Sequence, residues 1–439
     1  MTHKDNVKTA GIYTLGCKVN QYESEAIAEG LESRGYKIAD FDSECDIYII
    51  NSCTVTAESD RKARQLIRRA IKKNPEAFIL VCGCYSQNSP EDVSKIEGVD
   101  YICGTSNKMS IVDEVCALYS QGHKNEVAKI CVPSLEGAAF EPMCIKKFDR
   151  TRAYIKIQDG CESKCAYCAI PAARGPVRSK PLSDVLSEVK LLTLGGCREI
   201  VLTGIETGDW GRDLPEKCNL AHLLSEVDKI EGIGRVRLGS LDPAIIKPDF
   251  VEKIKNLSSL AHHFHISLQS GSSPVLAGMR RKYNADQAMR AIKLLRDAFP
   301  DLQLTTDVIV GFPGETDEDF ENTKNFVREA EFLMIHVFPY SKRAGTVAAK
   351  MKNQVDEGVK KSRVGELSAL AGEIRHKILD SLAGTKTEVL FETLKDGYAY
   401  GHTAEFVEVK AKCERDIRGE VHKVEILSND GDICLCDLI

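Results

Sequence analysis

The sequence has 439 residues, of which 43% are hydrophobic and 28% are charged, and this balance predicts a globular protein of two to four domains rather than a disordered or fibrous chain. The formal net charge of −6 gives no general attraction to nucleic acid, so a basic surface has to be sought locally. No run of about 18 apolar residues occurs, and the first residues lack the apolar core of a signal peptide. We therefore expect a cytoplasmic protein that does not enter a membrane.

Short apolar runs alternate with helical patterns between residues 11 and 104. The runs occupy residues 12–15, 47–50 and 78–81, and a fourth run at residues 100–103 would extend the series. This alternation predicts an α/β domain with a Rossmann-like parallel sheet. Glycines and prolines between about Ser120 and Pro142 indicate a linker, so we place this first domain at residues 1–135.

The same alternation continues in a second domain, which we place at residues 143–378. Its helical patterns include residues 183–194 and 285–299. The strand candidates begin near Ala153, Glu199, Arg235, Phe264, Leu302 and Leu333. Six such units predict an incomplete (β/α)6 barrel, and in barrels of this kind the chemistry takes place at the carboxyl ends of the strands.

A third region, residues 379–439, has a different pattern. Short alternating runs at residues 388–392 and 404–409 are separated by glycines, which mark turns. We expect a small all-β barrel here.

Seventeen cysteines are more than an average cytosolic protein of this length carries, and a reducing compartment favours metal binding over disulfides. Cys161, Cys165 and Cys168 form a CxxxCxxC triplet after the first expected barrel strand. Thiolates are soft ligands for iron–sulfur clusters or zinc, and three in one loop can reach three metals of one cubane. A closed zinc site needs a fourth ligand, and the next cysteine, Cys197, lies at the end of an expected helix.

This loop, with the aromatic Tyr167 before its last cysteine, resembles the loop of the radical S-adenosylmethionine (SAM) superfamily. The resemblance implies a catalytic 4Fe–4S cluster on Cys161, Cys165 and Cys168, whose open iron is chelated by the amino and carboxylate groups of SAM. Reduction would cleave SAM to a 5′-deoxyadenosyl radical. The protein itself would contribute orientation, tuning and the exclusion of water.

A second set of cysteines, Cys17, Cys53 and Cys84, is dispersed along the first domain, but its members share a position relative to the strands. Each follows an expected strand by two or three residues. Ligands bind at the carboxyl edge of open α/β sheets, so these thiols can hold a second cluster there. The alternative is that all three are small buried hydrophobic residues.

The residues around these cysteines resemble the amino-terminal domain of the methylthiotransferases. The matching words are TLGCKVN at residues 14–20, NSCTV at 51–55 and GCYSQ at 83–87. The family's Gly-Cys-x-x-Gln word implies that Cys84 is the ligand and that Cys82 points into the sheet. The resemblance covers nearly the whole chain, with further words at residues 174–179, 237–243, 265–272 and 311–316. Residues 397–403 are similar to the TRAM module, a small RNA-binding β-barrel.

Within the family, the LTGIETG word at residues 202–208 looks like the branch that modifies N6-threonylcarbamoyladenosine in tRNA. The resemblance implies a 2-methylthio product at the adenosine beside the anticodon, made with two SAM molecules and two 4Fe–4S clusters. One SAM would methylate a sulfur added to the second cluster, and the other would yield the radical that activates adenine C2. The implied partners are the tRNA anticodon stem-loop and an electron donor such as flavodoxin or ferredoxin, and we expect a monomer.

Two alternatives stay open at this point. Another methylthiotransferase of the same superfamily would act on isopentenyladenosine in tRNA or on a side chain of a ribosomal protein. A non-enzymatic RNA-binding metalloprotein would hold zinc or a single cluster and would not cleave SAM.

Candidate SAM contacts are the residues expected at the carboxyl ends of the barrel strands, and Val337 and Phe338 could pack on the adenine of SAM. The full set of cofactor-binding candidates is Tyr167, Thr203, Gly204, Glu206, Ser240, Gln269, Val337 and Phe338. A packing role is the alternative for each of them.

RNA binding needs a positive surface, and residues 61–73 supply one on an expected helix. Its buried stripe would be Ala63, Leu66, Ile67 and Ala70, while Arg61, Arg64, Arg68 and Lys72 would form a face that attracts phosphate. The alternative is a solvated face without a ligand.

The last domain is less suited to an electrostatic grip, because acidic side chains outnumber basic ones there. Shape contacts from Tyr398, Tyr400 and His402 would have to contribute more to RNA binding. Alternatively, the module is mainly structural.

Overall fold

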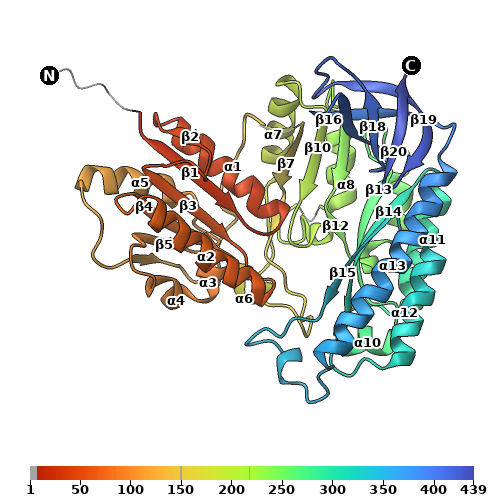
Figure 1. The fold of residues 1–439 in the computed structure, drawn as a ribbon, viewed down its shortest axis with the longest axis horizontal. Coiled ribbons are helices and arrows are strands. Elements are labelled where there is room, and N and C mark those ends of the chain that lie inside the picture. The colour runs from red at the N-terminus through yellow and green to blue at the C-terminus, as the bar shows by residue number, and fades with distance from the viewer. Residues whose placement is uncertain (1–6, 149–150, 217) are drawn as a thin grey trace. The chain divides into compact units, whose positions relative to one another are not determined.

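The computed structural model describes residues 7–148, 151–216 and 218–439, which belong to two compact units (Figure 1). The first unit runs to Lys147 and also contains Tyr154–Ser163 and Cys168–Lys180. The second unit contains the remainder, including Lys164–Tyr167 and Pro181–Ile439.

The first unit is built on a six-stranded sheet of order β2-β1-β3-β4-β5-β6, in which all neighbouring strands are parallel. The strands are β1 (Thr9–Thr14), β2 (Lys37–Ala39), β3 (Ile47–Ser52), β4 (Phe78–Gly83), β5 (Tyr101–Cys103) and β6 (Lys129–Cys131). The four expected runs are confirmed as β1, β3, β4 and β5. The edge strands β2 and β6 were not expected, because each begins with a lysine and forms no apolar run, unlike the equally short but buried β5, and β6 lies within the stretch interpreted as a linker.

Helices cover both faces of this sheet, which explains why β3 and β4 are buried along their whole length. α1 (Lys18–Glu32) and α5 (Ser110–Gln121) pack their apolar side chains on one face, and α2 (Ala57–Lys73) and α4 (Pro90–Ser94) pack on the other. α3 (Cys84–Asn88) directly follows β4. The later segments of this unit contribute β8 (Gln158–Asp159), α6 (Ile170–Arg174) and β9 (Arg178–Ser179).

The second unit carries the strands of an incomplete barrel. They are β10 (Glu199–Thr203), β11 (Arg235–Leu238), β12 (Ser240–Leu241), β13 (His263–Gln269), β14 (Gln303–Val310) and β15 (Met334–Pro339). At Gly239 the chain changes partner, because β11 pairs with β10 whereas β12 pairs with β13. The sheet orders are β11-β10-β7 and β12-β13-β14-β15, with β7 (Arg152–Lys156) straddling the division between the units. Each of the six expected strands is therefore confirmed, with β11 and β12 sharing one position.

Helices follow the barrel strands. They are α7 (Leu182–Leu194), α8 (Leu220–Asp228), α9 (Pro248–Ile254), α10 (Ser273–Gly278), α11 (Ala285–Ala298), α12 (Asp317–Ala330) and α13 (Glu357–Ser381). Capping boxes fix where α11 and α12 begin, since Asn284 pairs with Gln287 and Thr316 with Asp319. Within the described residues, no helix has the length and apolar character that crossing a membrane requires.

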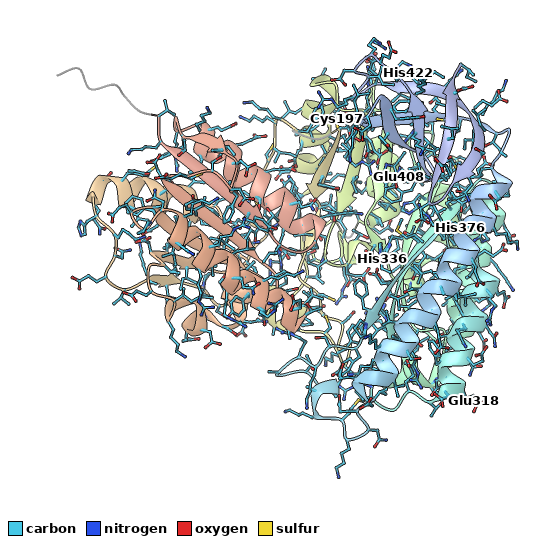
Figure 2. The ribbon with its side chains drawn as sticks, in the orientation of Figure 1. Cys197, Glu318, His336, His376, Glu408 and His422 are labelled. Carbon is cyan, nitrogen blue, oxygen red and sulfur yellow. The ribbon has the colours of Figure 1, made fainter. Side chains whose placement is uncertain are left out.

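The chain ends in a closed five-stranded barrel of order β16-β17-β18-β20-β19. Its strands are β16 (Lys386–Lys395), β17 (Tyr398–Thr403), β18 (Glu408–Lys412), β19 (Val421–Asp430) and β20 (Ile433–Leu438), and Glu408 on β18 and His422 on β19 are labelled in Figure 2. The all-β prediction is confirmed, but the expected strand at residues 404–409 is wrong in its first half. Thr403 and Val407 close a turn, and Phe406 within it has a φ of 72°.

Gly83 is the last residue of β4 and directly precedes Cys84, the first residue of α3. A substitution at Gly83 tests how tightly this junction is packed. Its φ is 101°, and a Cβ there would collide with the backbone of Ser52. Gly83→Ala should cost at least about 2 kcal/mol of unfolding free energy, because it combines an unfavourable φ with a clash. Gly35 has a φ of 85° but nothing near its missing Cβ. Gly35→Ala should cost only about 1 kcal/mol.

Urea unfolding of the full chain, followed by circular dichroism under reducing conditions, measures both values. Equal costs for the two substitutions would show that the contact with Ser52 is not tight.

Candidate functional site

Cys17, Cys53 and Cys84 lie at the carboxyl edge of the first unit's sheet, in the position expected from the sequence. Cys17 precedes α1, Cys53 follows β3, and Cys84 follows β4. The order β2-β1-β3-β4-β5 is that of flavodoxin-like sheets, whose topological switch point lies between β1 and β3. The loops that carry Cys17 and Cys53 therefore leave the sheet where folds of this class bind their ligands.

The three loops bring their thiols close together. Gly16 approaches Cys53 so closely that a Cβ on Gly16 would lie 2.8 Å from the Cβ of Cys53, and its φ of 99° favours glycine. Burial raises the pKa of the Cys53 thiol to about 11, and the neighbouring Cys84 and Cys17 sulfurs add to this rise. Each thiol therefore lies within electrostatic reach of the others.

This donor set fits a cluster with one open iron. All three cysteines are free thiols, and three thiolates from one sheet edge match three corners of a cubane. Burial raises the pKa of Cys53 and Cys84, so metal binding would displace their protons. Within residues 7–148, 151–216 and 218–439, no three His, Cys, Asp or Glu side chains are grouped to hold a single metal ion. A cubane instead distributes its three protein ligands over three iron atoms.

Cys82, the rival of Cys84, lies in the hydrophobic core. It is fully buried in the hydrophobic cluster between the sheet and helices α1 and α5, to which Ile27 of α1 and Val112 of α5 also belong. The expectation that Cys82 points into the sheet is therefore confirmed.

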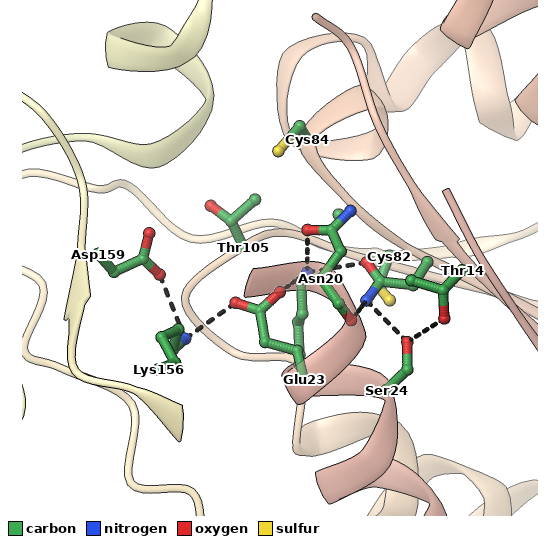
Figure 3. Close-up of polar contacts among 12 residues, drawn as sticks. Thr14, Asn20, Glu23, Ser24, Cys82, Cys84, Thr105, Lys156 and Asp159 are labelled. Carbon is green, nitrogen blue, oxygen red and sulfur yellow. Dashed lines mark hydrogen bonds and ion pairs between the residues drawn. The ribbon is translucent and has the colours of Figure 1, made fainter. Parts of the chain in front are cut away.

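A group of buried charged side chains lies beside Cys84, and the sequence did not reveal it. Figure 3 shows Lys156 between Glu23 and Asp159, with its Nζ donating to the two carboxylates over 2.9 and 3.3 Å. Arg174 bonds to both carboxylates and also donates from Nε to the Sγ of Cys84 over 3.4 Å. The one local signal is the place of Glu23 on α1, where it is buried together with Val19 and Ile27.

Two cysteines of the CxxxCxxC triplet belong to the first unit, where each accepts a backbone hydrogen bond. The N–H of Ser163 donates to the Sγ of Cys161, and the N–H of Ile170 donates to the Sγ of Cys168, both over 3.4 Å. Such N–H donors stabilise the thiolate form that iron requires.

Cys165, the third cysteine of the triplet, belongs to the second unit. Its Sγ accepts a hydrogen bond of 3.2 Å from Nη1 of Arg281, and the adjacent Ala166 is fixed by backbone bonds to Met279 and Ala348. All three sulfurs of the triplet thus have N–H donors, as the thiolate ligands of an iron–sulfur cluster commonly do.

The candidate SAM contacts lie at the carboxyl ends of the barrel strands, as predicted. Thr203 ends β10 and is followed by Gly204 and Glu206, Ser240 follows β11, and Gln269 ends β13. Gln269 has a φ of 70°, a strained conformation for a residue with a side chain. Strain of this kind is concentrated at functional sites.

The aromatic and apolar candidates occupy the same end of the second unit. Val337 is half-buried and Phe338 is 45% exposed near the end of β15, so the Phe338 ring is accessible to a ligand. Tyr167 is half-buried against Met279 and Phe312, and its hydroxyl accepts from Arg281 over 3.5 Å.

Three ionisable side chains, Arg281, Asp242 and Glu206, lie near one another at the strand ends. Nη2 of Arg281 forms an ion pair of 2.8 Å with Asp242. Burial raises the pKa of Glu206 to about 8, and the negative charges of Asp242 and Asp209 add to the rise. Asp242 and Arg281 were not predicted as site residues, although Asp242 stands in the family word at residues 237–243 and Arg281 in the basic run at residues 280–282.

Cys197, the remaining candidate for a fourth zinc ligand, lies at the opposite end of β10 (Figure 2). It is buried, and its S–H donates to the carbonyl oxygen of Glu199 over 3.2 Å. Cys165 lies beside Arg281 and Asp242 at the carboxyl end, so Cys197 does not join it.

The basic helix is α2, and its buried stripe of Ala63, Leu66, Ile67 and Ala70 is confirmed. Arg68 and Lys72 are exposed. Arg61 forms an ion pair with Glu58, and Arg64 donates to the hydroxyl of Tyr85 over 3.1 Å. Half of the expected phosphate-binding side chains therefore already have partners within the protein.

The C-terminal barrel places Tyr398, Tyr400 and His402 on one outward face of β17, because burial alternates along the strand. Lys410 lies over the ring of Tyr398, 5.6 Å from its centre. The two tyrosines and this lysine form a mixed aromatic and basic surface.

His402 lies where the C-terminal barrel meets the core of the second unit. The ring of Phe406 stacks between His402 and His263, with 4.7 Å between ring centres on each side. Arg152 and Arg237 also lie over the Phe406 ring, and Arg237 pairs with the buried Glu199. Burial and the charge of Arg152 lower the pKa of His402 to about 4, so the ring is neutral at physiological pH.

Comparison with known proteins agrees with this arrangement. Residues 155–327 match the model of the radical SAM superfamily, and residues 9–104 match the uncharacterized protein family UPF0004. The threonylcarbamoyladenosine tRNA methylthiotransferase MtaB of Bacillus subtilis is 41% identical over 427 residues, which are 95% of this chain and 94% of that protein. The chain belongs to the radical SAM methylthiotransferase family. It is an enzyme that uses the 4Fe–4S cluster of that superfamily.

Other relatives of this methylthiotransferase show how far the similarity extends. MtaB of Thermotoga maritima is 39% identical and aligns with 99% of this chain and 98% of its own length. The tRNA-2-methylthio-N(6)-dimethylallyladenosine synthase of Acetivibrio thermocellus is 34% identical over 89% of this chain and 83% of its own length. Among solved structures, the radical SAM methyltransferase TsrM from Kitasatospora setae has a TM-score of 0.58, with 14% identity over 78% of this chain and 77% of TsrM, a similarity of fold.

The raised pKa of Glu206 makes the stability of this methylthiotransferase depend on pH. Between its ordinary pKa of 4.5 and about 8, the carboxyl is protonated in the folded chain and ionised in the unfolded chain. The folded state then binds the extra proton, so stability falls as pH rises through this window. Relative to Glu206→Gln, the free energy of unfolding of the parent should fall by at most about 1.4 kcal/mol per pH unit between about pH 5 and pH 8.

Urea unfolding at several pH values measures this difference. Glu226 on α8 serves as the control, because it is half-buried, its hydrogen bond with Lys229 lowers its pKa, and Glu226→Gln should give no such slope. Parallel curves for the parent and Glu206→Gln would show that Glu206 is ionised in the folded protein.

Proposed function

We propose that this methylthiotransferase adds a methylthio group to C2 of N6-threonylcarbamoyladenosine at position 37 of tRNA, beside the anticodon. Two relatives named for threonylcarbamoyladenosine tRNA methylthiotransfer are 39% and 41% identical over nearly the whole chain, which supports this substrate. The observation that carries the proposal is the presence of two separate cysteine triplets, each suited to a 4Fe–4S cluster, because the reaction has to generate a radical and also deliver sulfur.

The residues of the chain divide these tasks. When bound, the cluster on Cys161, Cys165 and Cys168 together with SAM would supply the radical, and the cluster on Cys17, Cys53 and Cys84 would supply the sulfur with a methyl group from a second SAM. Ser163, Ile170 and Arg281 donate hydrogen bonds to the three sulfurs of the first triplet. The strand-end residues, including Thr203, Ser240 and Gln269, would hold SAM.

RNA recognition would use two surfaces of the chain. Arg68 and Lys72 on α2 are exposed and would attract phosphate, while Tyr398 and Tyr400 would contribute contacts with the shape of the RNA. His402 lies on the same face of β17 and would contribute to these contacts with the RNA.

The proposal extends to the oligomeric state, location, electron donor and domains of the protein. We propose a monomer in the cytoplasm, reduced by a donor such as flavodoxin or ferredoxin. Residues 1–135 would form the sulfur-delivering domain, residues 143–378 the radical SAM core and residues 379–439 the TRAM module.

Deleting the gene should remove the 2-methylthio group from threonylcarbamoyladenosine in total tRNA, measured by mass spectrometry of nucleosides. The intact chain should restore it, whereas Cys161→Ala should not, since loss of one thiolate disables the radical cluster. Cys131→Ala is the matched control, because this cysteine is exposed on an edge strand. The proposed substrate is wrong if the deletion strain keeps the methylthio group on threonylcarbamoyladenosine and instead loses it from isopentenyladenosine or from a ribosomal protein.

Iron content tests the second cluster. After anaerobic reconstitution, the parent chain should bind about eight iron atoms and Cys17→Ala about four, since each cubane holds four. Cys17→Ala should still cleave SAM to 5′-deoxyadenosine when reduced, which liquid chromatography detects. If the parent binds only about four iron atoms and Cys17→Ala binds as many, the second cluster does not exist.

A further inference from the structure

The buried charged group beside Cys84 has more members than a structural contact needs. Exposure is 0% for Glu23, Lys108 and Arg174, 1% for Lys156 and 2% for Asp159. The group joins α1 to the segments Tyr154–Ser163 and Cys168–Lys180 and to Lys108, which lies two residues before α5. Contacts among these side chains therefore replace much of the water that each has lost.

The charges in this group do not balance. Four cations meet there, since Arg178 also approaches Asp159, with 3.5 Å between Nη2 and Oδ2. Burial would raise the pKa of Glu23, but the charges of Arg174, Lys108 and Lys156 outweigh it and hold the pKa well below its ordinary value. Asp159 is also held ionised, and Glu141 is the third carboxyl nearby. Four cations against at most three carboxylates leave a buried positive charge.

Arg174 directs this positive charge at Cys84. Its Nη1 bonds to Glu23 and Asp159 over 2.7 and 3.1 Å, and its Nη2 bonds to Asn20 and Glu23. These contacts fix the plane of the guanidinium, so that Nε donates to the Sγ of Cys84 over 3.4 Å. A lysine could not hold two carboxylates and a sulfur in this way, because only arginine presents such a planar fork.

A purely structural role does not account for the arrangement. Buried ion pairs are seldom more stabilising than well-packed apolar side chains, and an unbalanced charge costs more still. Nη1 and Nη2 of Arg174 donate to oxygen atoms, whereas Nε donates to Cys84. An anionic sulfur ligand at Cys84 would therefore neutralise the excess positive charge at the Nε–H group. The positive charges of Arg174 and Lys108 also oppose the rise in the pKa of Cys84 that burial causes.

We propose that Arg174 is a positioning residue for the second cluster, in which its guanidinium stabilises the anionic Cys84 ligand and the buried positive charge sets the reduction potential of that cluster. The inference rests on the proposed function, because it needs a cluster on Cys17, Cys53 and Cys84. Reduction of the cluster adds one electron from the reductant and makes it more negative. Positive charge and N–H donors near the sulfur favour that state and raise the potential.

The test uses the full chain carrying Cys161→Ala, Cys165→Ala and Cys168→Ala, so that only the second cluster is loaded. Its midpoint potential is measured by anaerobic titration with dithionite and mediators, followed by electron paramagnetic resonance. Arg174→Gln removes the charge and should shift the potential to more negative values. Arg174→Lys keeps the charge without the fork and should give a smaller negative shift.

Glu23→Gln provides the opposite change. It removes a negative charge that opposes Arg174, so the potential should shift to more positive values. A general loosening of the site would move both variants in the same direction, whereas the proposed electrostatic role requires opposite shifts. Lys180→Met is the matched control, because Lys180 is a buried cation of the same segment that bonds to Tyr22 and Met143 instead, and it should leave the potential unchanged.

The outcomes separate the two proposals. If the triple variant binds no iron, the second cluster and therefore the proposed function fail. If it binds about four iron atoms but Arg174→Gln and Glu23→Gln leave the potential unchanged or shift it in the same direction, the role of Arg174 is wrong. Should Arg174→Gln not fold, Lys108→Met replaces it and should also shift the potential to more negative values, because Lys108 is a fully buried cation of the same group and pairs with Glu23, as Arg174 does.

Discussion

Parallel strand pairing is the constraint on which the rest of this structure depends. When strands run parallel, all their carboxyl ends meet at one edge, so residues far apart in the sequence are brought together there. In the first unit this edge gathers Cys17, Cys53 and Cys84, and in the second it gathers Glu206, Asp242 and Gln269. Because helices cover both faces of the first sheet, its carboxyl edge is the part that is left to the strand-end loops.

Electrostatics adds a second level of organisation to these edges. Arginine N–H groups reach a cysteine sulfur in both units, from Arg174 to Cys84 and from Arg281 to Cys165. Each of these arginines is held by carboxylates, so its direction is fixed before any cluster binds. Iron–sulfur sites depend on such outer contacts, because hydrogen bonds to sulfur alter the charge that the ligand can hold.

The sequence was sufficient wherever the information is local. Apolar runs located the long strands, the CxxxCxxC spacing located one thiol set, and the distance from strand end to cysteine located the other. The edge strands β2 and β6 could not be predicted because their exposed residues, each set including a lysine, form no apolar run. The ion pair between Glu23 and Lys108 escaped because its partners lie 85 residues apart and no local pattern joins them. Phe406 was predicted to lie in a strand because phenylalanine favours extended backbone, whereas its positive φ is imposed by the surrounding turn.

The stack around Phe406 has a consequence for how this protein could have been assembled during evolution. Phe406 comes from the C-terminal barrel, while His263, Arg152 and Arg237 come from three different strands of the core. A barrel borrowed from another protein would leave Arg237 and Glu199 open to water unless it brought an aromatic ring on a matching turn. The barrel and the three strands that carry Arg152, Arg237 and His263 are therefore expected to be inherited together as one module.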